Sequence, residues 1–236
     1  MRRILLATVA AFTLAPAVLP ADGLIYQLPD DGTWSQYDLK FTMVRGDQRR
    51  EATGTLRVAS VGKATAAGKD GRWIEFRLDL MPPDGNEQTI IAKVLVPEEQ
   101  LAAGKSPIDH MARGWIKLGN DREPEALNDD NRGPLPIFLA GPGTDHKALD
   151  ATKIENAKLG EIEAAGDSGT IEYQEQTRKL AAKYETRRHE KSPFGVVSMS
   201  IEVESEQNGQ RTADTNATLT LAETGDTALS DLPNQK

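Results

Sequence analysis

Cysteine is absent from this chain of 236 residues. The absence excludes disulfide bonds, thiolate zinc sites, iron–sulfur clusters and catalysis by a thiol, and it excludes a lipid-modified N-terminal cysteine. Aromatic side chains are also scarce, at 5% of the residues. Ligand pockets are usually lined with aromatic side chains, so this scarcity favours a structural or protein-interaction module.

Basic residues are outnumbered by acidic ones, 28 to 36, which gives a formal net charge of -8 at pH 7. An acidic surface repels the phosphates of nucleic acids and the anionic head groups of membranes. We therefore expect no nucleic-acid partner. No apolar run reaches the roughly 20 residues that a membrane-spanning helix needs, so we also expect no transmembrane segment.

The first 21 residues have the three parts of a secretory signal peptide. Arg2 and Arg3 supply the positive charge, residues 4–14 form the apolar run, and Ala17 and Ala21 mark two candidate cleavage sites. The sequence thus predicts a signal peptide over residues 1–21, cleaved after Ala17 or Ala21. The mature protein is expected to be soluble, not lipidated, and periplasmic or secreted.

Much of the remaining chain alternates between apolar and polar residues, which is the pattern of a half-buried strand. The clearest case is Tyr37, Leu39, Phe41 and Met43, with polar residues between them. Strands are predicted at residues 37–45, 52–61, 72–80, 88–96, 171–177, 180–189, 196–204 and 212–221. Asn208-Gly209 is a strong hairpin signal between the last two. We predict a mainly β fold, with a curved antiparallel sheet in a single domain over residues 22–225.

The pattern changes between residues 97 and 115. Residues 97–104 begin with proline and acidic residues and end with glycine, as a short helix does. Ile108, Met111, Ala112 and Trp115 then recur at helical spacing. We predict a helical insert near residues 97–115 and a disordered, polar tail over residues 226–236.

Gly166-Asp167-Ser168-Gly169 matches the residues around the nucleophile of trypsin-like proteases. A serine nucleophile needs a base within hydrogen-bond reach, and the three histidines, His110, His146 and His189, lie in different segments. We therefore interpret residues 166–169 as a turn, and we predict no catalytic residue, no metal site and no cofactor. An exported hydrolase that pairs Ser168 with a histidine is the enzymatic alternative.

Apolar side chains of several predicted elements are expected to meet on one side of the sheet. The four that we name as candidate ligand-binding residues are Phe41, Phe76, Trp115 and Met199. Such a cluster forms either a plain hydrophobic core or the lining of a cavity for an apolar, lipid-like ligand.

Four segments carry a resemblance to a known family. They are residues 32–37 (Gly-Thr-Trp-Ser-Gln-Tyr), 72–75 (Arg-Trp-Ile-Glu), 93–97 (Lys-Val-Leu-Val-Pro) and 192–197 (Ser-Pro-Phe-Gly-Val-Val). With its signal peptide, meander, helical insert and second meander, the chain resembles the periplasmic lipoprotein-carrier and lipoprotein-receptor half-barrels over most of residues 30–222. The resemblance implies a half-barrel whose concave face is plugged by the insert.

Together, these features predict an exported, non-enzymatic protein of the cell envelope that binds an apolar or lipid-like ligand on the concave face. The alternative is a structural module that binds an envelope protein partner and has no ligand.

Overall fold

The computed structural model describes residues 23–232, except residues 67, 84, 103, 129–130, 133–134, 142 and 176–177. The predicted signal peptide and both candidate cleavage sites lie outside the described residues. In the described part of the chain, none of the helices has the length and apolar character that a membrane crossing requires.

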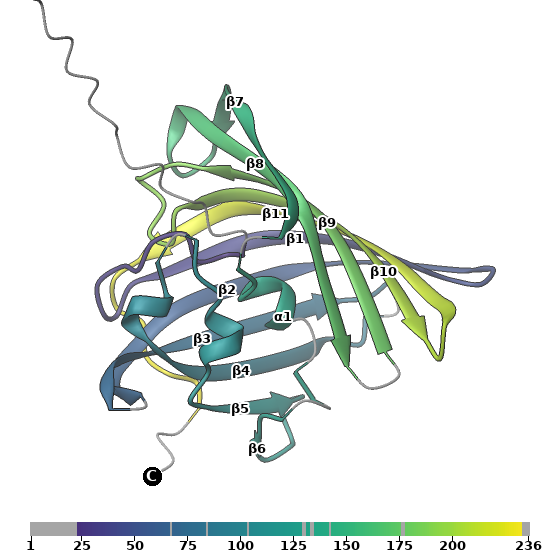
Figure 1. The fold of residues 1–236 in the computed structure, drawn as a ribbon, viewed down its shortest axis with the longest axis horizontal. Helices are drawn as coiled ribbons and strands as arrows, with labels where there is room; N and C mark the ends of the chain where they lie inside the picture. Colours follow the sequence, from purple (N-terminus) through teal and green to yellow (C-terminus); the bar gives the residue numbers. More distant parts are fainter. Residues whose placement is uncertain are drawn as a thin grey trace, which may run out of the picture.

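Eleven strands form one antiparallel sheet in the described residues (Figure 1). The first six are β1 (Trp34–Arg45), β2 (Gln48–Ala66), β3 (Lys69–Met81), β4 (Gln88–Pro97), β5 (Arg113–Leu118) and β6 (Glu125–Ala126). The other five are β7 (Thr144–Asn156), β8 (Gly160–Glu175), β9 (Arg178–Arg188), β10 (Val196–Gln207) and β11 (Gln210–Gly225). Their order across the sheet is β6-β5-β4-β3-β2-β1-β11-β10-β9-β8-β7, which confirms the predicted mainly β, antiparallel fold.

The sheet consists of two meanders that meet where β1 pairs with β11. Short turns join most neighbouring strands within each meander, whereas the longer segment of residues 98–112 joins β4 to β5. At the Asn208-Gly209 turn both residues have positive φ, 54° and 76°, as a two-residue hairpin turn requires. Because β6 and β7 are the two edges of the sheet, the chain between them has to cross from one edge to the other. The short helix α1 (Leu135–Phe138) lies on this crossing.

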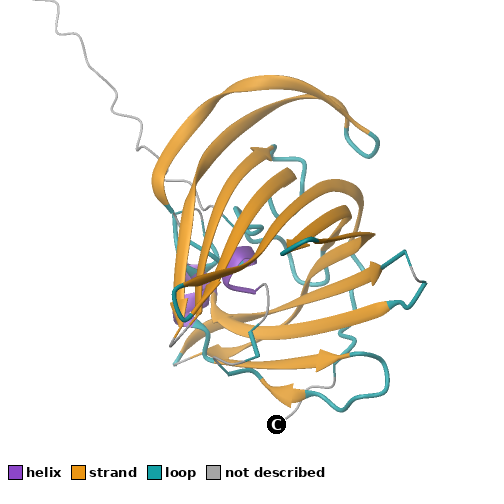
Figure 2. Ribbon diagram, turned by 90° about the vertical axis from the view of Figure 1, so that its right-hand side faces the viewer, coloured by secondary structure: helices purple, strands orange, loops and turns teal. Residues whose placement is uncertain are grey.

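The sheet curves around a concave face that holds the main core, as the side view shows (Figure 2). Strand geometry places every second side chain of a strand on this face. On this face Tyr37 of β1 lies opposite Leu56 of β2, and Ile74 of β3 lies opposite Val94 of β4; all four are fully buried. The alternation seen in the sequence thus places the main core on one side of the sheet.

Three segments outside the sheet fill the inner half of the concave face. They are residues 23–28, the 3-10 helix η2 (Pro107–His110) and α1. The backbone N–H of Leu24 donates to the carbonyl of Phe138 at 2.9 Å, and that of Ile108 donates to the carbonyl of Leu139 at 3.2 Å. These bonds tie the three segments together over the core (Figure 1).

The predicted helical insert near residues 97–115 is only partly helical. Glu98–Gln100 (η1) and Pro107–His110 form single 3-10 turns, and residues 113–118 form strand β5 instead. Met111 has extended backbone angles of -63° and 117°, which end the helical conformation before Trp115. The helical spacing of the apolar residues between 108 and 115 therefore does not reflect a continuous helix.

The hairpin of β7 and β8 contains residues 166–169, which the sequence predicted to be a turn. The glycines there allow side chains of the neighbouring strand β9 to lie across β8. A Cβ atom on Gly166 would lie 2.7 Å from Nη1 of Arg187, and one on Gly169 would overlap the hydroxyl of Tyr184. Glycine in this strand marks a close approach, not a turn.

Residues 226–232 differ from the predicted disordered tail, and we call them the C-terminal strap. Ala228 and Leu232 are buried. The backbone N–H of Asp231 donates to the Glu75 carboxylate at 2.9 Å, on the convex face of β3. The strap therefore packs against the face of the sheet that lies opposite the core.

Candidate ligand-binding site

The inner half of the concave face is filled by the chain itself. Phe76 of β3 stacks against Phe138 of α1, with ring centroids 6.0 Å apart. The space left between the sheet and α1 is about 10 Å³. That is roughly the room that one water molecule needs, so no ligand fits beneath α1 in this conformation.

Tyr37 anchors the centre of this filled half. Its hydroxyl donates a hydrogen bond to the carbonyl of Val196 at 3.1 Å, which links β1 to the start of β10. Burial raises the pKa of Tyr37 far above its ordinary value of 10.0, because the phenolate would lose its hydration. The side chain therefore acts as a neutral hydrogen-bond donor in the core.

The outer half of the concave face is open where β3 ends and the β1–β2 hairpin continues. β2 pairs with β3 only as far as Thr53, which lies opposite Met81. Beyond that point the chain after β3 turns away, and one edge of β2 has no described strand beside it. We call this place the hairpin step and define it by Phe41, Glu51, Ala52, Pro82 and Pro83.

Two cavities meet at the hairpin step. The cavity on the concave side has about 520 Å³. Besides the step residues, its lining includes Met43, Arg49, Arg50, Leu80 and Gln88. Small-molecule sites usually have volumes of about 300–1,000 Å³, so this cavity is large enough for a ligand.

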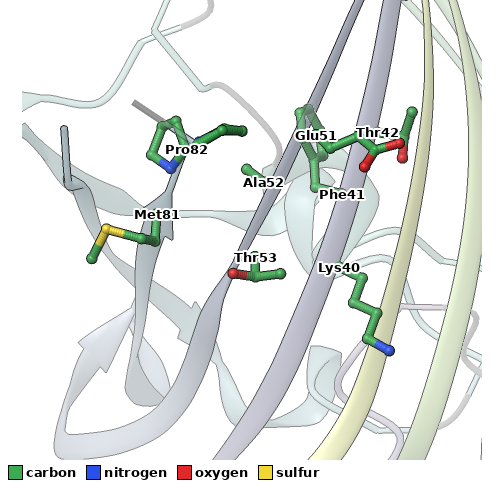
Figure 3. A pocket seen from close by; sticks show the side chains of 9 residues that line it. Lys40, Phe41, Thr42, Glu51, Ala52, Thr53, Met81 and Pro82 are labelled. Atoms are coloured by element: carbon green, nitrogen blue, oxygen red, sulfur yellow. The ribbon is translucent and has the colours of Figure 1, made fainter. Parts of the chain in front are cut away.

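The second cavity lies on the other side of the step and has about 530 Å³. Figure 3 shows Met81 and Pro82 on one side of it, and Ala52, Thr53 and Phe41 across from them. Lys40 and Thr42 also line this cavity. Met81 is about half exposed, at 47%, so this cavity opens to solvent next to an apolar side chain.

The charged groups at the step differ in whether they form an ion pair. Nη2 of Arg49 pairs with Oε1 of Glu51 at 2.7 Å, and both side chains are exposed. Arg50 lies opposite Met43 in the register of β1 and β2, so it belongs to the concave side. Arg50 forms no ion pair with any other described residue.

Three of the four predicted ligand-binding residues lie on the concave face. Phe76 and Met199 are buried in the core, whereas Phe41 is partly buried and borders the open cavity. Trp115 lies on the convex face, because it belongs to β5 and is paired there with Lys93. Its ring packs against the ring of Trp73, with ring centroids 5.2 Å apart. The four residues therefore do not form one site.

The sequence analysis did not name Met43, Leu80 and Pro82, which line the concave-side cavity, as candidate ligand-binding residues. A signal for them was present: Met43 continues the alternation of Phe41, Leu80 continues that of β3, and Pro82-Pro83 marks a turn. The missing information was the register, which shows that β3 ends while β1 and β2 continue.

The geometry around Ser168 does not form a nucleophile–base pair. Ser168 lies opposite Glu185 of β9, whereas its neighbour Asp167 points to the other face of the strand. There, Oδ1 of Asp167 lies 3.2 Å from Nε2 of His146. His189 accepts a hydrogen bond from the backbone N–H of Lys191 at 3.1 Å. The hydrolase alternative gains no support from this arrangement.

Asp167 instead belongs to a buried ionic cluster. It forms an ion pair with Arg188 of β9, and the guanidinium of Arg188 stacks over the ring of Tyr26 at 4.0 Å. Through Tyr26, this cluster links residues 23–28 to the edge of the concave face. Among the described residues, no three His, Asp or Glu side chains gather in a way that would hold a metal ion.

No family model matches the chain, and no curated protein matches its sequence. The solved structures that are similar to it in fold include the following two. A DUF1329 family protein from Desulfovibrio piger is 12% identical, with a TM-score of 0.33, and the match covers 84% of this chain and 88% of that one. A domain from Vibrio parahaemolyticus, which its name assigns to outer membrane lipoprotein sorting, is 10% identical, with a TM-score of 0.35 and coverage of 86% and 89%. Similarity at this level concerns the fold and carries no function over to this chain.

Proposed function

We propose that this chain is an exported, non-enzymatic protein of the cell envelope that binds the acyl chain of a lipid-like ligand at the hairpin step. The observation that carries the proposal is the cavity of about 520 Å³ on the concave side, lined by Phe41, Met43, Leu80 and Pro82. This lining is continuous with the core, because Phe41 and Leu80 pack against it. Burying an acyl chain against such a surface is worth about 25 cal/mol per Å² of apolar area.

Export is part of the proposal and is supported by the sequence pattern of residues 1–21. The structure adds one compatible feature. Leu24 and Ile25, just beyond the predicted cleavage region, are buried in the core. We therefore expect the exported form to begin no later than residue 23, because further trimming would remove core side chains.

The experiment that tests the proposal is native mass spectrometry of the exported protein with palmitate and with a monoacylglycerol. Phe41→Glu places a charge in the cavity, and we expect it to weaken binding at least tenfold, or about 1.4 kcal/mol. Thr218→Glu is the matched control, because Thr218 is exposed on the opposite face of β11, beside Lys40 of β1. Circular dichroism and the unfolding midpoint establish that both variants are folded.

If the wild-type protein binds neither lipid, or if both variants bind equally well, the proposal is wrong. The second candidate function, a module that binds an envelope protein, would then take its place. The specific observation in its favour is that Met81 and Val44 are exposed at 47% and 37%, close to an edge of β2 that has no described strand beside it. Such an edge accepts an extended segment of a partner.

A further inference from the structure

We propose that the ligand of the hairpin step carries an anionic head group, a carboxylate or a phosphate, and that the guanidinium of Arg50 binds it. This inference rests on the proposed function and names the class of ligand. It starts from the mixed character of the concave-side cavity, which has apolar walls from Phe41, Met43 and Leu80 and an arginine pair along β2. A ligand that matches both parts is an amphiphile with one charged end.

The sign of that charge follows from the ion pairs at the step. Glu51 is the one carboxylate in the described lining of this cavity, and Arg49 already neutralises it at 2.7 Å. Arg50 makes no ion pair with a described residue, so its positive charge is available to a ligand. A guanidinium presents a planar fork of N–H donors that matches a carboxylate or phosphate and can bind it with two hydrogen bonds.

Carboxylates on the neighbouring β10–β11 hairpin do not neutralise the positive charge of Arg50. Asp214 lies closest in register, opposite Val44 of β1. Both Asp214 and Glu204 are held by Arg211, at 2.6 Å and 3.3 Å. In a chain with a net charge of -8, the step thus retains a local positive group beside an apolar cavity. The net charge of the chain already favours solubility, so solubility does not require a cation at this position.

The test compares single-chain lipids that share one acyl chain and differ in the head group. The probes are palmitate, the corresponding lysophosphatidic acid and the neutral monoacylglycerol, measured by titration calorimetry at low and at high salt. We expect the wild-type protein to bind the better of the two anionic lipids about tenfold more tightly than the neutral one, and we expect salt to reduce this preference. Which anion binds more tightly identifies the head group as carboxylate or phosphate.

The variant Arg50→Gln should remove the preference and leave the affinity for the neutral lipid unchanged. Arg113→Gln is the matched control, because it removes the same charge from an exposed position on β5. The inference is overturned if the wild-type protein binds neutral and anionic lipids equally, or if Arg50→Gln weakens both alike. Binding of the neutral lipid without any preference would overturn this inference alone, whereas no binding of any lipid would overturn the proposed function as well.

Discussion

Replacing Glu75 with alanine should release the C-terminal strap and destabilise the protein. Glu75 is buried on the convex face and lies opposite Lys93, which is buried as well. Its carboxylate accepts hydrogen bonds from the hydroxyl of Ser230 at 2.6 Å and from the backbone N–H of Asp231 at 2.9 Å. Nζ of Lys93 donates to the same Ser230 hydroxyl at 2.9 Å. The Glu75 carboxylate therefore holds the strap directly, and the Ser230 hydroxyl links it to Lys93.

The magnitude follows from the loss of the hydrogen bonds that the Glu75 carboxylate accepts from Ser230 and Asp231, since a hydrogen bond to a charged group contributes about 1.5–3 kcal/mol. We expect a loss near the lower end for the two bonds together, about 3 kcal/mol, because a detached strap lets water reach Lys93. A second substitution, Lys93→Met, should recover part of this loss in the Glu75→Ala background, because it removes a buried charge that the Glu75 carboxylate no longer stabilises.

Urea unfolding followed by tryptophan fluorescence measures the free energy of unfolding, and digestion with carboxypeptidase reports on release of the strap. Glu99→Ala is the control: it breaks an exposed ion pair, with Lys69 at 2.5 Å, and should leave the unfolding midpoint unchanged. A loss below about 1 kcal/mol for Glu75→Ala, with a strap as resistant as in the wild type, would show that the strap is not held as described.

The same variant has a defined pH dependence. Burial lowers the pKa of Lys93 from its ordinary 10.5, and the charge of Glu75 opposes that shift. Without Glu75 the pKa falls further. Between the lowered folded value and 10.5 the unfolded state binds more protons than the folded state, so stability rises with pH in this window. The deficit of Glu75→Ala relative to the wild type should therefore shrink as the pH approaches 10.5.

The sheet was readable from the sequence wherever a strand has one buried and one exposed face. β1, β10 and β11 lie in the interior of the sheet and show that alternation directly. β7 was not predicted, because it is an edge strand with mostly exposed residues, and two register shifts interrupt its pairing with β8. Neither face of β7 is consistently buried, so no period of two appears in its sequence.

The candidate site was less predictable, because it depends on contacts between distant segments. The sequence identified Phe41 as apolar and facing the core, but only the strand register shows that Phe41 lies beyond the end of β3. The spacing of Ile108 and Trp115 fits a helix by coincidence, and the pairing of β5 with β4 overrides it. Likewise, the strap is polar in sequence and becomes ordered through Glu75, more than 150 positions away along the chain.

Two further predictions concern the filled half of the concave face. Burial raises the pKa of Tyr37 in the folded state above the ordinary 10.0, so the stability of the wild-type protein is complete below pH 10 and falls above it. Tyr37→Phe should remove this decline. Urea unfolding at a series of alkaline pH values measures it. Phe76→Ala should cost about 3–5 kcal/mol, because Phe76 is buried and stacks on Phe138 at 6.0 Å. The truncation also leaves a cavity beneath α1, where about 10 Å³ is free now. If acyl chains bind only at the hairpin step, palmitate affinity should change little in folded Phe76→Ala protein, since Phe76 does not line that cavity. A large gain in affinity would instead show that the ligand enters the inner half when space is provided.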